Sequence, residues 1–118
     1  MNALQELRDA NIVRSAEWTG HAPGQSDLLF MAVELGGEAG EALNAVKKYW
    51  RGKSGYVGSI DQSSLIHALT EELADVIICA DRVASVFDID LSKAVAEKFN
   101  ATSKKNGLRT RFDSTEAP

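Results

Sequence analysis

Two short segments of this chain carry pairs of carboxylates at a spacing that an α-helix places on one side. Glu38 and Glu41 lie three residues apart in GGEAGEAL, and Glu72 and Asp75 lie three apart in TEELADVII. Residues three apart share a helix face, so each pair presents two neighbouring carboxylates. Like charges so placed repel each other unless a cation lies between them. Two such helices facing each other would form a four-carboxylate cage suited to a hard divalent cation.

The second pair has apolar surroundings. Asp75 follows Leu-Ala and precedes Val-Ile-Ile-Cys-Ala, a run that is apolar nearly all the way round a helix. A helix of that kind is expected to be buried. An isolated buried carboxylate is costly unless it is paired, metal-bound or protonated. We therefore expect Asp75 to be a buried ligand, the alternative being a solvated face of ordinary Glu–Lys pairs.

The rest of the chain predicts an all-α fold in a single domain, residues 1–118. Glycine-rich breaks at 19–25 and 51–61 and aspartates near 88–90 divide four helical segments. The expected N-caps are Ser26 for the second, Asp61 or Ser63 for the third and Asp88 or Asp90 for the fourth, with Gly107 ending the fourth. The expected architecture resembles a four-helix bundle, and an elongated hairpin of this size often completes its core by oligomerising. The expected helices span about 3–18, 26–50, 61–87 and 88–106, and the polar tail from about residue 110 is expected to fray.

Composition narrows the class of protein. Of the 118 residues, 44% are hydrophobic and 25% are charged, and the net charge of −4 gives no argument for nucleic-acid or membrane binding. No apolar stretch approaches 18 residues and no signal peptide is apparent, so we expect a cytoplasmic protein. The single cysteine, Cys79, excludes an internal disulfide and is expected to be a small buried side chain.

An all-oxygen cage favours Mg²⁺, with Mn²⁺ as the second choice. A di-iron site would need Glu-x-x-His pairs, which neither His21 nor His67 completes. Magnesium indicates phosphate chemistry, in which a bound water becomes the nucleophile. No P-loop or dinucleotide-binding glycine motif is present. Basic residues that could meet phosphates lie near the ends of the second and fourth helices: Lys47, Lys48, Arg51, Lys53, Lys98, Lys104, Lys105, Arg109 and Arg111.

The motifs GEAGEAL and EELADVII, followed by EKFNATSKKNG, resemble the MazG-like all-α nucleoside triphosphate pyrophosphohydrolases. The resemblance spans about Leu28 to Arg111. It implies Mg²⁺-dependent hydrolysis of a (deoxy)nucleoside triphosphate to the monophosphate and pyrophosphate, a house-cleaning reaction on the nucleotide pool. It also implies a homodimer or homotetramer.

By motif matching, the resemblance implies that Glu38, Glu41, Glu72 and Asp75 are the metal ligands, with a glutamate of the first pair orienting the attacking water. It further implies that Lys98, Asn100 and Lys105 contact the substrate. The chain departs from the family where Gly37 replaces a second acid, for which Glu34, one turn earlier, is a partial substitute.

The aromatic residues Trp18 and Trp50 are the leading candidates to stack on the base. Two alternatives stay open. One is phosphoribosyl-ATP pyrophosphatase activity, which the same resemblance allows. The other is a non-catalytic helical interaction module whose acids form a docking face.

Overall fold

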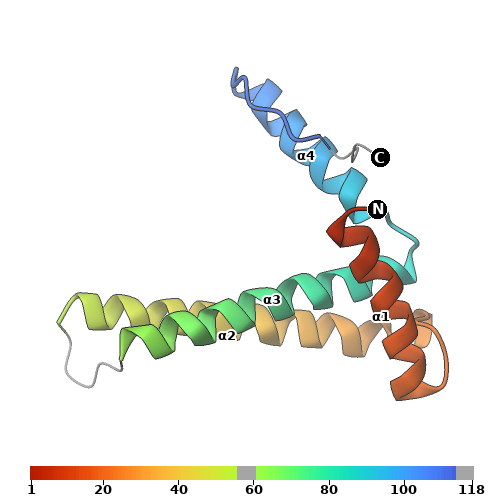
Figure 1. The fold of residues 1–118 in the computed structure, drawn as a ribbon, viewed down its shortest axis with the longest axis horizontal. Coiled ribbons are helices and arrows are strands. Elements are labelled where there is room, and N and C mark those ends of the chain that lie inside the picture. The colour runs from red at the N-terminus through yellow and green to blue at the C-terminus, as the bar shows by residue number, and fades with distance from the viewer. Residues whose placement is uncertain (56–60, 114–118) are drawn as a thin grey trace. The chain divides into compact units, whose positions relative to one another are not determined.

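The computed structural model describes residues 1–55 and 61–113, and over these residues the chain is all-α with no strand (Figure 1). Its four α-helices confirm the predicted class and number. A single 3-10 turn, η1 (Gln25–Asp27), precedes the second of them. No helix in the described ranges is long and apolar enough to cross a membrane. The helices are α1 (Ala3–Thr19), α2 (Leu28–Lys53), α3 (Gln62–Val86) and α4 (Leu91–Lys105).

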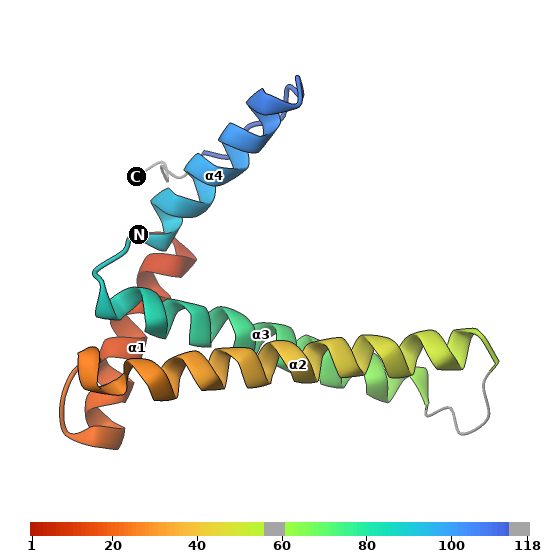
Figure 2. The same ribbon diagram turned by 180° about the vertical axis from the view of Figure 1, so that it is seen from behind.

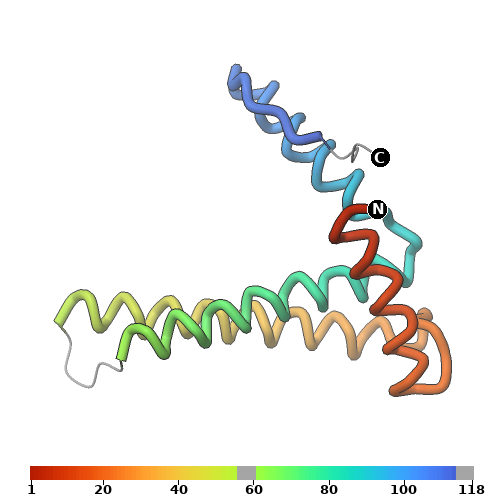
Figure 3. Tube along the Cα trace, viewed as in Figure 1, coloured from red at the N-terminus to blue at the C-terminus, as the bar shows by residue number. Residues whose placement is uncertain are grey.

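The chain divides into two compact units, Ser26–Ala80 and Met1–Gln25 with Asp81–Pro118. In the first unit, α2 and most of α3 run antiparallel and side by side, as the opposite views of Figures 1 and 2 and the trace in Figure 3 show. The buried apolar residues of this hairpin are Met31, Ala42, Ala45, Leu65 and Cys79. The burial of Cys79 confirms the sequence-based expectation. The second unit contains α1, the C-terminal end of α3, and α4.

Side chains cap the first turns of three helices. Asn2 and Gln5 form a capping box on α1, in which each side chain accepts a hydrogen bond from the other residue's backbone N–H. The Asp61 carboxylate accepts from the backbone N–H of Ser64 at the start of α3. Asp90 accepts from the backbone N–H of Lys93 and caps α4. The predictions that Asp61 and Asp90 act as caps are confirmed.

The predicted cap of α2 is wrong. Ser26 lies inside η1, and Asp27 occupies the N-cap position with no side-chain hydrogen bond to the helix. Because the 3-10 turn leads straight into α2, the helix begins after Asp27 instead of after Ser26. At its other end α2 continues through Arg51 to Lys53, beyond the predicted end near residue 50. Residues 56–60 of the predicted loop lie outside the described residues.

Helices α3 and α4 end in the same hydrogen-bonding pattern. In α4 the N–H groups of Gly107 and Leu108 donate to the carbonyls of Lys104 and Ser103, with Gly107 at φ +67°. This is a Schellman motif, which confirms Gly107 as the terminator. In α3 the corresponding left-handed residue is Asp88, at φ +52°. Its N–H donates to the Ser85 carbonyl, and the next N–H donates to the carbonyl four residues before Asp88.

The expectation that the helix around Asp75 is buried all round is wrong for this chain. Leu73 and Ile77 are 51% and 52% exposed, and Asp75 is half-buried. The reason is geometric: the hairpin places one neighbour, α2, beside this stretch of α3, so the opposite side of the helix faces outward. Apolar composition alone therefore overstated the burial.

Candidate metal centre

The two acidic segments meet inside the α2–α3 hairpin. Glu38 comes from the middle of α2, and Glu72 and Asp75 come from the middle of α3. The antiparallel course of the helices brings these middles to the same level (Figure 2). The i, i+3 spacing keeps Glu72 and Asp75 on one face of α3, and all three side chains are half-buried.

The three carboxylates form a compact group of oxygens. One oxygen each from Glu38, Glu72 and Asp75 can be chosen so that all three lie within 4.8 Å of one another. Three negatively charged oxygens at this separation repel unless a proton or a cation is shared among them. Sequence spacing predicted these three residues as members of one site, and the geometry confirms that they come together.

Two of the three residues have an oxygen with unmet hydrogen-bonding capacity. Glu38 Oε2 and Glu72 Oε2 are shielded from solvent and accept no hydrogen bond within the described chain. When both carboxyl groups are ionised, neither can donate to the other. A proton placed between them would satisfy both, and so would a bound cation.

The pKa of Glu72 reflects this crowding. It is raised from an ordinary 4.5 to about 7, first because the carboxyl group can share a hydrogen bond with Glu38 and then because it can share one with Glu41. Partial burial and the negative charges of the same two glutamates raise the pKa further. With a pKa of about 7, Glu72 is about half protonated at neutral pH in the absence of a competing cation.

These observations fit a hard divalent ion. The donor set is carboxylate oxygen only, without nitrogen or sulfur, as Mg²⁺ and Mn²⁺ prefer. A cation at this point would be coordinated by the shielded oxygens, and its charge would offset the repulsion that raises the pKa of Glu72. Three carboxylates also leave room around a six-coordinate ion for water or phosphate oxygens.

Glu41, the fourth predicted ligand, lies beside this triad without belonging to it. Its side chain is exposed, and it is not among the oxygens that meet within 4.8 Å. It is nevertheless close enough to Glu72 to raise that residue's pKa. Glu41 therefore borders the site formed by Glu38, Glu72 and Asp75.

Trp50 and the basic residues of α2 lie toward the C-terminal end of the same helix. Trp50 is twelve residues beyond Glu38, which at 1.5 Å per residue is about 18 Å along the axis. Its side chain is 57% exposed. Nearby, Lys53 Nζ lies 5.8 Å from the centre of the Tyr49 ring. Trp50 and these basic residues are therefore too far along α2 to contact the same phosphate-sized group that the triad would contact.

The remaining predicted substrate residues belong to the other compact unit. Lys98 and Lys105 are exposed on α4. The Asn100 amide is occupied by the chain itself: its Nδ2 donates to the Phe112 carbonyl at 2.8 Å, and its Oδ1 accepts from the Phe112 N–H at 2.6 Å. The Phe112 ring also lies 6.0 Å from that of Phe99. The segment up to Asp113 is therefore held against α4, where fraying had been expected; residues 114–118 lie outside the described chain.

Trp18 is 63% exposed on α1, and its ring has cationic neighbours. The guanidinium carbons of Arg14 and Arg82 lie 4.8 Å and 5.6 Å from the ring centre. These are cation–π distances. A nucleobase stacked on Trp18, as predicted, would have to share the ring with these guanidinium groups.

Sequence reasoning missed a buried polar network in the second unit. Asp81 is 1% exposed and accepts hydrogen bonds from Arg8 Nε at 3.1 Å and Asn11 Nδ2 at 3.0 Å. Arg8 Nη2 lies 3.0 Å from Asp81 Oδ1 and also donates to the Ile89 carbonyl. The sequence offers a signal for burial alone: Asp81 directly follows the apolar run 76–80, and no local pattern indicates Arg8 as its partner.

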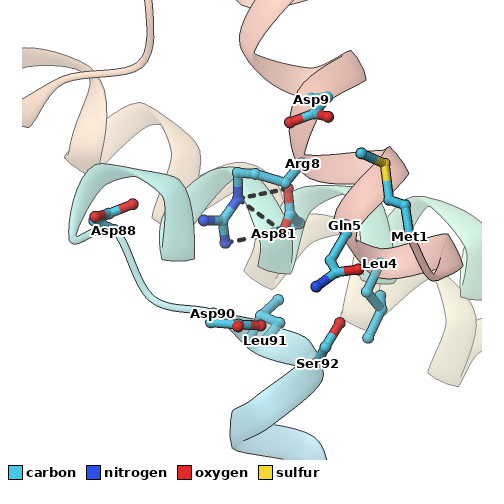
Figure 4. A pocket seen from close by; sticks show the side chains of 10 residues that line it. All are labelled: Met1, Leu4, Gln5, Arg8, Asp9, Asp81, Asp88, Asp90, Leu91 and Ser92. Atoms are coloured by element: carbon cyan, nitrogen blue, oxygen red, sulfur yellow. Dashed lines mark hydrogen bonds and ion pairs between the residues drawn. The ribbon is translucent and has the colours of Figure 1, made fainter. Parts of the chain in front are cut away.

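Figure 4 shows this ion pair at the edge of a cleft of about 350 Å³. Carboxylates of Asp9, Asp88 and Asp90 also line the cleft, together with apolar side chains from the N-terminal residues. The Arg8 guanidinium is held by Asp81 and the Ile89 carbonyl, so its position is fixed by the fold. We interpret this network as structural.

His67 is a surface residue, as expected. Its Nε2 lies 2.7 Å from Glu71 Oε1, and the two side chains are 77% and 65% exposed. Glu71 is thus an acid on the outside of α3, immediately next to Glu72 in sequence and outside the triad. Comparison with known proteins adds nothing to this description, since no family model, curated protein or solved structure matches the chain.

Proposed function

We propose that Glu38, Glu72 and Asp75 bind Mg²⁺, with Mn²⁺ as a substitute, and that the protein hydrolyses a (deoxy)nucleoside triphosphate to the monophosphate and pyrophosphate. The observation that carries the proposal is the meeting of these three carboxylates within 4.8 Å, from helices that are far apart in sequence. The motif resemblance to the MazG-like pyrophosphohydrolases supplies the reaction. The acids lie between helices, whereas a docking face would turn them outward, and this favours the enzyme over the interaction module.

A bound Mg²⁺ would supply Lewis-acid polarisation of a phosphoryl oxygen and a water of lowered pKa. The chain's own part is to hold the ligand oxygens in place from two rigid helices. Glu41, at the border of the triad, is positioned to accept a proton from a water molecule or to orient it. Glu38 shares this role only if it is not fully engaged as a ligand.

The substrate's phosphates need cations that the triad does not provide. In the hairpin unit the basic residues lie at the C-terminal end of α2: Lys47, Lys48, Arg51 and Lys53. In the other unit we propose Lys98 and Lys105 as phosphate contacts. Asn100 can contact a substrate only if Phe112 releases its amide. Trp18 and Trp50 remain the proposed base contacts. We also propose that the bundle is completed by self-association into a dimer or tetramer, because Leu29, Val33 and Leu43 are exposed on α2.

The test is pyrophosphate release from each of the standard ribo- and deoxyribonucleoside triphosphates, with Mg²⁺ and with EDTA. The proposal predicts metal-dependent release from one or a few of them. Asp75→Asn should lower the rate about a hundredfold or more, since even outer partners of metal ligands are worth about ten- to a hundredfold.

Glu71→Gln is the matched control, because Glu71 is a neighbouring acid on α3 that is 65% exposed and outside the triad. It should leave the rate unchanged. No release from any nucleotide, with Mg²⁺ still bound, would contradict the substrate class. Phosphoribosyl-ATP is the next substrate to test in that case. Neither release nor Mg²⁺ binding would favour the interaction module.

A further inference from the structure

The side of α2 that faces away from α3 carries a row of exposed apolar side chains. Leu29, Val33 and Leu43 are 78%, 65% and 71% exposed. At 100° per residue these three positions fall within an arc of about 80°, which also contains Gly36, Gly40, Lys47 and Arg51. The buried positions Met31 and Ala42 lie on the opposite side of the helix. An exposed stripe of this kind is typical of an interaction surface.

The stripe is symmetric about its middle. The midpoint between Leu29 and Trp50 is the peptide bond between residues 39 and 40, and the same midpoint relates Val33 to Val46. All four of these side chains are exposed, at 78%, 57%, 65% and 47%. A helix packed antiparallel on a copy of itself, with a two-fold axis at this midpoint, would therefore set Leu29 near Trp50 and Val33 near Val46 of the copy, and would set Lys47 near Ala32.

At the centre of the stripe, a large residue is matched with a small one. The same midpoint relates Leu43 to Gly36, and Gly40 lies next to the axis. Neither glycine has another group within 4 Å of the point where a Cβ would stand, so both leave open space on the helix surface. Leu43 of each copy can thus enter the space over Gly36 of the other, as a ridge enters a groove.

The charges of α2 favour the same orientation. From Ser26 to Ser54 the acids end at Glu41 and the bases begin at Lys47. An antiparallel pair places the basic end of one α2 beside the acidic beginning of the other, with Arg51 near Asp27. A parallel pair would place like charges side by side. Charge complementarity of this kind selects a partner and its register.

We propose that this face of α2 binds a second copy of the same chain, with the two α2 helices antiparallel about a two-fold axis near Gly40. The proposal gives the self-association a surface, an orientation and a register. It does not depend on the proposed reaction, because the triad lies on the opposite side of α2.

The first part of the test is the mass in solution by light scattering. The wild type should have twice the chain mass of 12.8 kDa, or a larger even multiple of it. Leu43→Glu places two carboxylates at the centre of the interface and should halve the mass found for the wild type, with helix content unchanged by circular dichroism because Leu43 is 71% exposed. Ile66→Glu, at a 51% exposed apolar position on α3, is the matched control and should leave the mass unchanged.

The second part tests the register with a short bismaleimide cross-linker in a Cys79→Ala background. Val33→Cys and Val46→Cys should each give little cross-linked dimer alone, and should cross-link efficiently when the two variants are mixed. Efficient cross-linking of Val33→Cys with itself would indicate a parallel pair and overturn the proposal. A monomeric wild type would also overturn it, and would leave this face to another protein or to another part of the chain. An oligomer without the mixed cross-link would overturn it too.

Discussion

Glu38 on α2 and Glu72 on α3 each have one oxygen that is shielded from solvent and accepts no hydrogen bond within the described residues, and both carboxylates belong to the same small group in the hairpin. Their proximity is the first cause of the raised pKa of Glu72, and Asp75 completes the group within 4.8 Å. Two carboxylates this close repel each other, and either a bound proton or a bound cation reduces that repulsion. The stability of the protein should therefore depend on pH and on divalent cations.

Metal-free protein should lose stability as the pH rises from about 4.5 to about 7. The pKa of Glu72 is about 7 in the folded chain and 4.5 ordinarily, so between these values the folded state holds a proton that the unfolded state has lost. The free energy of unfolding then falls with rising pH, and this contribution is fully lost above the folded-state pKa. Melting temperatures in EDTA across this range check it, with Glu72→Gln removing the dependence. A Glu71→Gln variant that behaved like Glu72→Gln would contradict the assignment to Glu72.

Removing two of the four acids by Glu41→Gln and Asp75→Asn should raise the stability of the metal-free protein, because fewer like charges are crowded together. The same variant should lose the increase in melting temperature that Mg²⁺ gives to the wild type. Thermal unfolding with EDTA and with Mg²⁺ measures both effects. A double variant that is less stable than wild type without metal would show that the acids are held by other partners.

Arg8→Ala should destabilise the fold by about 3–5 kcal/mol, because it leaves the buried Asp81 carboxylate without its cation. Chemical denaturation measures this loss. Replacing both partners, by Arg8→Met with Asp81→Leu, should recover much of it, since apolar pairs often substitute well for buried ion pairs. Lys93→Ala is the control: its ion pair with Glu97, at 3.9 Å on the surface, should be worth less than about 0.5 kcal/mol.

Asp88→Gly should stabilise the protein by about 0.5–1 kcal/mol, because Asp88 ends α3 at φ +52°, a backbone region where glycine is unstrained. The α4 terminus provides the reverse experiment. Gly107→Ala places a Cβ at φ +67° and should destabilise by about 1 kcal/mol. If both substitutions change the free energy of unfolding in the same direction and by the same amount, the left-handed backbone conformation does not determine the stability of these two helix ends.

Local sequence signals were enough for the number and type of the helices and for bringing Glu38, Glu72 and Asp75 into one group, but they also placed Glu41 in that group. Three-residue spacing predicts which carboxylates share a face, and the break predicted at 51–61 separates the two helices that carry Glu38 and Glu72. Contacts between distant segments were not encoded in any local pattern. The pairing of Arg8 with Asp81, and the occupation of Asn100 by Phe112, depend on how separate helices meet. The expectation that the helix around Asp75 is buried was wrong for the same reason, because the apolar pattern of a helix does not show how many other helices pack against it.

The most direct test of the account is the calorimetric titration of Mg²⁺ into metal-free wild type and Asp75→Asn at pH 8, where Glu72 is largely ionised. The account predicts saturable binding to the wild type and affinity weakened about tenfold or more in Asp75→Asn, with Glu71→Gln binding like the wild type. Equal Mg²⁺ affinity for wild type and Asp75→Asn, or no binding to either, would contradict the claim that Glu38, Glu72 and Asp75 form a metal centre.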